Sequence, residues 1–207
     1  MDKTAIEHWS PVIGGQFWWT GLIFVLIFVP LMIFLGSKIS SKQRDMVLYG
    51  MGIYQLGNKA LTQIGYIFSD NYIMASNLPL HLCGLSGILA GIVVFYRKQI
   101  LFEFLYFFGL VGFIHSVLTP EFTGGVSSWK IFDYYVGHSM LIIIPVWLIK
   151  YYEFRLSHNA WWTSFIYLQL IVVLVSQANS IIGNGANYMY LAKAPIAVSY
   201  THLTLPT

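Results

Sequence analysis

Six long apolar stretches, separated by short polar segments, organise the chain. A bilayer core needs about 20 mostly apolar residues for each spanning helix, and each stretch has about this length. None shows the alternating polarity of a transmembrane β-strand. The predicted spans cover residues 17–35, 46–68, 78–96, 100–118, 131–149 and 160–182. This pattern predicts an all-α, multi-pass transmembrane helical bundle.

The composition favours the same class. Only 9% of the 207 residues are charged and 57% are hydrophobic, whereas about 25% are charged in an ordinary soluble domain. A soluble fold of this size cannot bury so much apolar surface. The net charge of +3 comes without a dense basic cluster, which argues against a nucleic-acid partner. We therefore expect membrane lipids as partners, and no metal or other cofactor.

Lysine and arginine predict the orientation of the chain, because they are enriched in cytoplasmic loops. Seven lie in or near the loops after the first, third and fifth spans, and three lie on the other side. The seven are Lys38, Lys42, Arg44, Arg97, Lys98, Lys150 and Arg155, and the three are Lys3, Lys130 and Lys193. The bias predicts that the N-terminus lies outside and that the loops after the first, third and fifth spans face the cytoplasm.

Polar side chains inside the spans gather at one depth. Such groups are costly in a bilayer and usually face the interior of the bundle. If the spans alternate in direction, the polar residues fall in the outer halves of five helices. The candidates are Asn58, Lys59, His81, Cys83, His115, His138 and Gln177, with Asn187 just after the last span. We interpret them as a polar cavity in the outer-leaflet half.

Each candidate also has a purely structural interpretation. Lys59 either pairs with Asp133 or binds an anionic head group. Side-chain amides often join helices, and a cysteine often packs as a small hydrophobic residue. His81 and Cys83 are about 200° apart around a helix. They cannot both face one narrow site unless Pro79 makes that turn irregular.

Three segments carry a resemblance to a known family: Leu78-Pro-Leu-His-Leu-Cys83, Tyr134-Tyr-Val-Gly-His138 and Gly185-Ala-Asn-Tyr-Met-Tyr-Leu191. The chain resembles the YwaF-like bacterial integral membrane family, which is related to eukaryotic transmembrane protein 164. The eukaryotic relative is similar to a phospholipid acyltransferase that uses a cysteine and a histidine. The resemblance implies that Cys83 and His138 hold these catalytic positions, and that the chain lies in a bacterial cytoplasmic membrane.

The resemblance also implies a seventh span, which this sequence lacks. Residues 198–207 look like a translated sequencing adapter. We therefore predict one transmembrane domain over residues 1–197, a foreign tail over 198–207, and a last span lost by truncation.

Three functions follow as alternatives. In the first, Cys83 attacks an acyl ester and His138 accepts its proton, as in a lipid acyltransferase or hydrolase. Asn187 or Gln177 would stabilise the oxyanion, and Lys59 would hold a phosphate.

The second alternative is a metal-dependent hydrolase, with His81, His115 and His138 as zinc ligands. The third is a transporter or a membrane protein that binds a lipid or another ligand without catalysis. The resemblance ranks the enzyme first.

Overall fold

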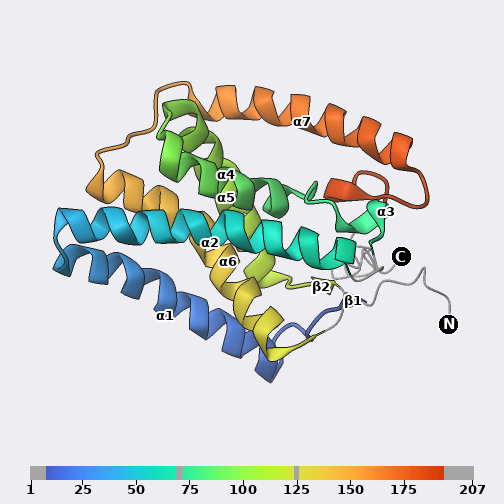
Figure 1. Cartoon of the computed structure of the whole chain (residues 1–207), viewed down its shortest axis with the longest axis horizontal. Coiled ribbons are helices and arrows are strands. Elements are labelled where there is room, and N and C mark those ends of the chain that lie inside the picture. The colour runs from blue at the N-terminus through green and yellow to red at the C-terminus, as the bar shows by residue number, and fades with distance from the viewer. Residues whose placement is uncertain (1–7, 69–71, 124–125, 194–207) are drawn as a thin grey trace, which may run out of the picture.

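The computed structural model describes residues 8–68, 72–123 and 126–193, and its architecture is a helical bundle (Figure 1). Six long helices are α1 (Gln16–Lys38), α2 (Ser41–Phe68), α4 (Leu82–Tyr96), α5 (Gln99–Leu118), α6 (Ser128–Tyr151) and α7 (Ala160–Ile182). Shorter elements are α3 (Met74–Asn77) and the 3-10 helix η1 (Tyr188–Tyr190). Two short strands, β1 (His8–Trp9) and β2 (Phe122–Thr123), pair antiparallel.

The helices confirm the predicted fold class and lie at the six predicted positions. Four of those in the described residues, α1, α5, α6 and α7, are long and apolar enough to cross a membrane. Helix α4 has 15 residues and is shorter, and α2 carries more polar side chains.

The predicted start of the third span at Leu78 is wrong. Helix α4 begins at Leu82, and both Leu78 and His81 have extended backbone angles. Pro79 explains the difference, because proline disfavours a helical conformation in the residue before it and has no N–H to donate.

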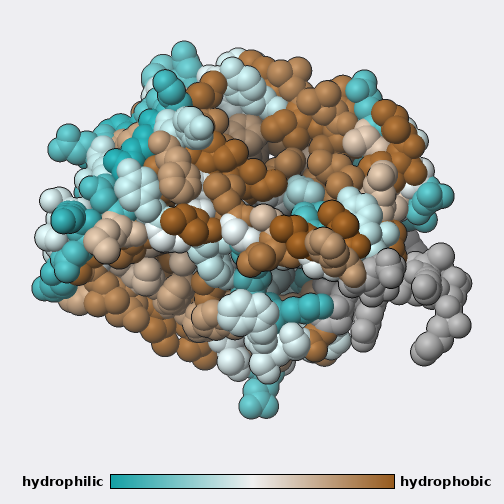
Figure 2. Space-filling view, in the orientation of Figure 1, coloured by the Kyte–Doolittle hydropathy of each residue, from teal (hydrophilic) through white to brown (hydrophobic). Residues whose placement is uncertain are grey.

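Helix α6 forms the centre of the bundle and packs against α1, α2, α4 and α5. Its buried side chains include Ile143, Ile144, Trp147 and Leu148, each at most 1% exposed. In contrast, α1 and α7 bury little of their length. Hydrophobic side chains cover much of the molecule's visible face (Figure 2). Outward apolar surface of this extent is expected where the solvent is lipid.

Helices α2 and α4 approach each other closely through glycines of α4. A Cβ atom on Gly91 would lie 2.4 Å from Cγ of Leu56, and one on Gly87 would lie 3.1 Å from Cε of Lys59. Small residues at such positions let helix backbones come together in a membrane. The contact lays the aliphatic stem of Lys59 along α4.

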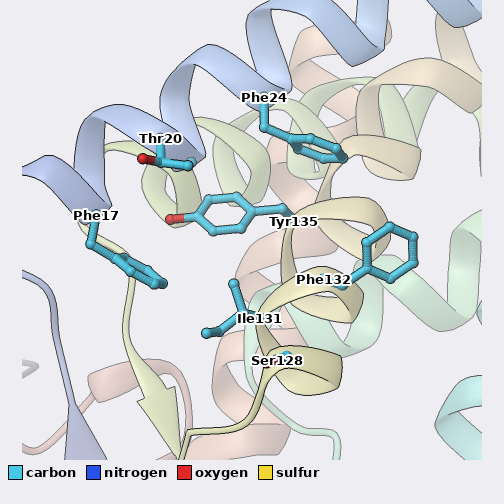
Figure 3. Close-up of a pocket in the computed structure, with 8 residues that line it drawn as sticks. Phe17, Thr20, Phe24, Ser128, Ile131, Phe132 and Tyr135 are labelled. Atoms are coloured by element: carbon cyan, nitrogen blue, oxygen red, sulfur yellow. The ribbon is translucent and has the colours of Figure 1, made fainter.

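A groove of about 350 Å³ lies between α1 and α6, near the end of the bundle where both helices begin (Figure 3). Its walls are mainly aromatic and aliphatic. They include Phe17, Thr20, Phe24, Ile131, Phe132 and Tyr135.

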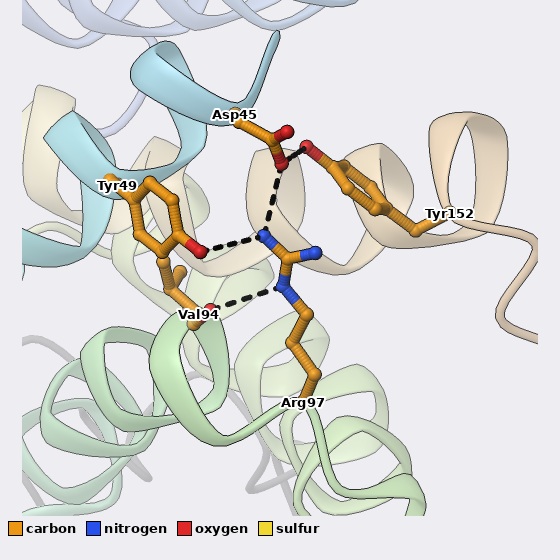
Figure 4. Close-up of polar contacts among 5 residues, drawn as sticks. All are labelled: Asp45, Tyr49, Val94, Arg97 and Tyr152. Atoms are coloured by element: carbon orange, nitrogen blue, oxygen red, sulfur yellow. Dashed lines mark hydrogen bonds and ion pairs between the residues drawn. The ribbon is translucent and has the colours of Figure 1, made fainter. Parts of the chain in front are cut away.

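At the opposite end, Arg97 joins three helices (Figure 4). Its Nη2 lies 3.1 Å from the Asp45 carboxylate and 3.3 Å from the Tyr49 hydroxyl. The guanidinium also stacks over the ring of Tyr152, 4.5 Å from its centroid. Tyr152 in turn donates a 2.6 Å hydrogen bond to Asp45. We call these four residues the Arg97 clasp.

Charges and burial in the Arg97 clasp move two pKa values in opposite directions. The hydrogen bonds from Tyr152 and Arg97 lower the pKa of Asp45. Burial and the hydrogen bond to Asp45 raise the pKa of Tyr152 to about 12. At neutral pH, therefore, Asp45 is a carboxylate and Tyr152 a neutral donor.

Candidate functional site

Cys83 lies in the first turn of α4, as its second residue. The backbone amides of Cys83 and Gly84 interact with its sulfur. The residue is half-buried, and its thiol is free. Its Cα and Cβ lie 3.7 Å from the place a Cβ on Gly112 would take, so α5 passes close beside it. The N-terminal end of a helix favours a negative charge, whereas burial of the sulfur favours the neutral thiol and is the larger of the two effects.

Polar residues from several elements surround the thiol. Lys59 of α2 and Glu121, which follows α5, interact electrostatically with Cys83. Tyr134 of α6 and Tyr190 of η1 do the same. With His138 these residues form what we call the Cys83 cluster: Lys59, Cys83, Glu121, Tyr134, His138 and Tyr190. All six are half-buried.

His138 is held in one tautomer by its own helix. Its Nδ1 lies 2.7 Å from the carbonyl oxygen of Tyr134 and must be the donor, because a carbonyl only accepts. A neutral ring then leaves Nε2 as a free acceptor. The ring packs against that of Tyr134, with centroids 4.3 Å apart, and interacts electrostatically with Lys59. No hydrogen bond between Cys83 and His138 occurs among the described residues, although Tyr134 and Lys59 interact with both.

Of the two alternatives for Lys59, the pairing with Asp133 is not formed. Asn58 donates a 2.6 Å hydrogen bond to Asp133, and the Tyr54 hydroxyl donates a second to the same oxygen. Asn58 lies next to Lys59 in the chain but points in a different direction around α2, and it satisfies the carboxylate in place of the lysine. Asn58 therefore joins α2 to α6, and within the described residues Lys59 makes no ion pair.

His81 contacts the segment after α7. Its Nδ1 accepts a hydrogen bond of 3.3 Å from the Met189 amide, and its ring lies 5.2 Å and 4.9 Å from those of Tyr188 and Tyr190. Asn187 stabilises the same segment, because its side chain bonds the backbone of Ala192 and Lys193.

Two predicted residues lie on exposed surfaces. Gln177 is exposed on α7. His115 is exposed near the end of α5, where its ring lies 3.4 Å from the Thr119 hydroxyl and lines a separate surface pocket. It nevertheless interacts electrostatically with His138.

In the part of the chain that the structure describes, no three side chains of histidine, cysteine, aspartate or glutamate come together as a metal site. The three-histidine zinc alternative therefore lacks its ligand geometry.

Three members of the Cys83 cluster are not among the site residues predicted from the sequence: Glu121, Tyr134 and Tyr190. The Tyr190 hydroxyl donates a 3.1 Å hydrogen bond to Glu121, and burial together with that carboxylate raises the pKa of Tyr190. The Tyr134 hydroxyl accepts from the Glu121 amide at 3.4 Å. Tyr134 and Tyr190 both belong to segments that carried the resemblance, and Tyr134 is also one of the polar residues inside the fifth predicted span.

Tyr188 fixes the segment that contains Tyr190. Its hydroxyl donates to the Met74 carbonyl at 2.6 Å and accepts from the Leu78 amide at 2.9 Å. The side chain of Asn179 bonds both the amide and the carbonyl of Tyr188. The segment after α7 is thereby tied to the start of α4, where Cys83 lies.

Comparisons with known proteins agree with a membrane fold. The chain matches the TMEM164 family over residues 7–206. It is 26% identical over 134 residues to an uncharacterized protein of Treponema pallidum (strain Nichols), which covers 62% of this chain. The chain spans about half the length of that relative, 53%. No solved structure matches the chain.

The family match bears on two further expectations. It confirms the expected relation to transmembrane protein 164, whereas the YwaF-like relation stays a prediction. The predicted foreign tail, residues 198–207 with His202, lies outside the described residues, and the match extends into it without supporting that prediction. By its apolar helices and its family match, the chain is a multi-pass helical membrane protein and belongs to the TMEM164 family.

Proposed function

We propose that the chain is a membrane-embedded, cysteine-dependent phospholipid acyltransferase or lipid acyl hydrolase. The observation that carries the proposal is the position of Cys83. Its sulfur lies at the N-terminal end of α4 and interacts with the ammonium of Lys59. Both features favour a thiolate, which is the nucleophilic form of cysteine, but burial of the sulfur opposes it more strongly. The proposed reaction therefore needs a base beside Cys83 to take the proton of the thiol. We further propose that the N-terminus lies outside a bacterial cytoplasmic membrane.

In the first step, the Cys83 thiol loses its proton to Nε2 of His138 and attacks the carbonyl carbon of an acyl ester. The ester C–O bond breaks, and the alcohol of the lysophospholipid leaves with the proton from His138. In the second step, water or the hydroxyl of another lipid attacks the thioester, and the thiol of Cys83 is restored. Catalytic contacts are often loose in a free enzyme and tighten in the complex.

The oxyanion of each tetrahedral intermediate needs hydrogen-bond donors. Gln177 is exposed and Asn187 is occupied with its own turn, so neither suits this role. The amides of Leu82, Cys83 and Gly84 lie in the first turn of α4, where backbone donors have no partner within the helix. We assign the oxyanion to these amides, and the phosphate of the head group to Lys59.

The test uses the fact that the sequence contains a single cysteine. Purified protein in proteoliposomes is incubated with a phospholipid labelled in its acyl chain. We expect transfer or release of the label, and an acyl group on the protein that hydroxylamine removes at neutral pH. Mass spectrometry should place this thioester on Cys83. The substitution Cys83→Ser should lower turnover at least about 1,000-fold, because a hydroxyl is a poor nucleophile at its ordinary pKa.

His138→Gln should slow both steps by about 100-fold or more, the usual contribution of a general base. His158→Gln is the matched control, because His158 is exposed in the loop between α6 and α7. Full acyl transfer by Cys83→Ser would refute the cysteine mechanism.

One observation favours a second candidate function. Lys59 is a half-buried cation inside the bundle, and within the described residues no carboxylate pairs with it. A cation in this position suits binding or transport of an anionic ligand without catalysis. Uptake of an anionic solute that Cys83→Ala leaves intact and Lys59→Met abolishes would favour this function over the enzyme.

A further inference from the structure

The groove between α1 and α6 contains a buried hydroxyl without a partner. Tyr135 is 4% exposed, and no hydrogen bond to its hydroxyl occurs among the described residues. The ring reaches across to α1, where a Cβ on Gly21 would clash with the hydroxyl oxygen. Figure 3 shows this hydroxyl between Phe17 and Thr20. A buried hydroxyl left unpaired is unfavourable, so an acceptor supplied from outside the chain would be favoured.

The remaining walls of the groove select an apolar occupant. Phe17, Phe24, Ile131 and Phe132 contribute hydrocarbon surface, and among the described residues no charged side chain lines the groove. Two further hydroxyls line the groove, from Thr20 and Ser128. The Thr20 hydroxyl already bonds the Gln16 carbonyl within α1, and Ser128 is exposed at the start of α6, away from the Tyr135 hydroxyl by most of two helical turns. An occupant therefore needs a long apolar part and a single acceptor near the Tyr135 hydroxyl.

The position of the groove identifies what supplies these features. Tyr135 lies seven residues after the start of α6, which is about 10 Å along the helix. Trp19, 50% exposed, lies near the start of α1, as expected of a tryptophan at the boundary between hydrocarbon and head groups. Acyl ester carbonyls of phospholipids lie just below this boundary, with their chains pointing toward the bilayer centre.

We propose that the groove binds one acyl chain of a glycerophospholipid from the surrounding bilayer, with its ester carbonyl accepting a hydrogen bond from Tyr135. The site is separate from the Cys83 cluster. Tyr134 faces Cys83, whereas the next residue, Tyr135, faces α1. The bound lipid completes the packing between α1 and α6.

Photocrosslinking in proteoliposomes tests the site. The probe is phosphatidylcholine with a diazirine in one acyl chain, and mass spectrometry maps the labelled peptides. We expect labelling of residues 17–24 and 128–135. Thr20→Trp fills the groove and should lower this labelling about fivefold or more, whereas Ile23→Trp on the exposed face of the same helix should leave it unchanged. Equal labelling of Thr20→Trp and the wild type would overturn the proposal.

A competition experiment tests the hydrogen bond itself. Phosphatidylcholine with ether-linked chains lacks the ester carbonyl but keeps the head group and chain length. The ester lipid should displace the probe from wild-type protein about fivefold better than the ether lipid, the factor expected of one net hydrogen bond. Tyr135→Phe keeps the ring and should abolish the difference. A preference for ester lipids that survives in Tyr135→Phe would refute the role of the hydroxyl. Cys83→Ala should label like the wild type, which separates this site from the proposed reaction.

Discussion

At the Arg97 end of the bundle, the charges of Arg97 and Asp45 lie 3.1 Å apart, and Tyr49 and Tyr152 complete their hydrogen bonds. At the Cys83 end, Lys59 has no such carboxylate within the described residues. Both ends use α2 and α4. Asp45 and Lys59 are 14 residues apart on α2, which is about 21 Å along the axis.

The difference distinguishes polar groups that join helices from polar groups that remain available to a ligand. In the Arg97 clasp, the donors and acceptors are paired with one another, so a ligand has to break an existing bond before it can bind. In the Cys83 cluster, Nε2 of His138 and the ammonium of Lys59 have no partner in the described part of the chain. Substitutions at the two ends should therefore separate activity from stability.

The largest effect in this comparison is expected for Lys59→Met. Methionine keeps the length of the side chain beside Gly87 and removes the charge. Loss of one charge-assisted contact to a lipid phosphate should lower acyl transfer about 10- to 100-fold. The midpoint of thermal unfolding in detergent should stay the same or rise, because an unpaired cation is costly inside a bundle.

Lys42→Met is the control for this prediction, because Lys42 is exposed near the start of the same helix. It should change neither the turnover nor the unfolding midpoint. A loss of several degrees in Lys59→Met with full turnover would mean that Lys59 is structural, and the contrast between the two ends would disappear.

The apolar pattern of the sequence predicts the fold well, because about 20 consecutive apolar residues have few alternatives to a spanning helix. The six predicted spans agree with the helices to within a few residues at most ends. The start of α4 is the one end at which the helix falls short of the predicted span. There, residues 78–81 are apolar enough for a span, but Pro79 disfavours the helix.

The candidate site was less predictable, because depth in a span does not determine which neighbour a side chain faces. Depth alone placed Gln177 beside Cys83, yet α7 turns this residue outward. Similarly, the opposite charges of Lys59 and Asp133 made their pairing one of two alternatives, but Asn58 reaches the carboxylate instead. Glu121 and Tyr190 come together only through the folded path of two loops, which no local pattern encodes.

At the Arg97 end, Arg97→Lys should lower stability and leave activity within about twofold. Lysine keeps the charge but loses the planar group that contacts Asp45, Tyr49 and Tyr152 together. Because the ion pair is partly exposed, we expect a loss of about 1 kcal/mol. For a protein of this size, this corresponds to about 2–4 °C in the unfolding midpoint.

The neighbouring exposed Lys98 provides the control, and Lys98→Gln should unfold like the wild type. An Arg97→Lys protein that loses acyl transfer without losing stability would place function at this end and reverse the comparison.

The smallest effect is a dependence of stability on pH that Tyr152→Phe should remove. The pKa of Tyr152 is about 12 in the folded protein, against about 10 in an unfolded chain. Between these values the folded state holds a proton that the unfolded state has released. Stability therefore falls as the pH rises from about 10 to about 12. Phenylalanine cannot titrate, so this part of the decline should be missing from the variant.

Asp45 of the same clasp gives a pH dependence of stability with the opposite sign. The pKa of Asp45 is lowered mainly by the hydrogen bond from Tyr152. The contribution of Asp45 to the stability of the fold is therefore present above about pH 4, and it is lost as the pH falls through the pKa of Asp45 in the folded state. Tyr152→Phe should weaken this acid-induced loss as well. Unfolding midpoints at pH 3, 8 and 11 measure both the acid-induced and the alkaline loss of stability, with Tyr96→Phe, at an exposed tyrosine, as the control. If Tyr152→Phe and Tyr96→Phe follow the same curve, Tyr152 does not couple the charge of Asp45 to folding, and the clasp depends on Arg97 alone.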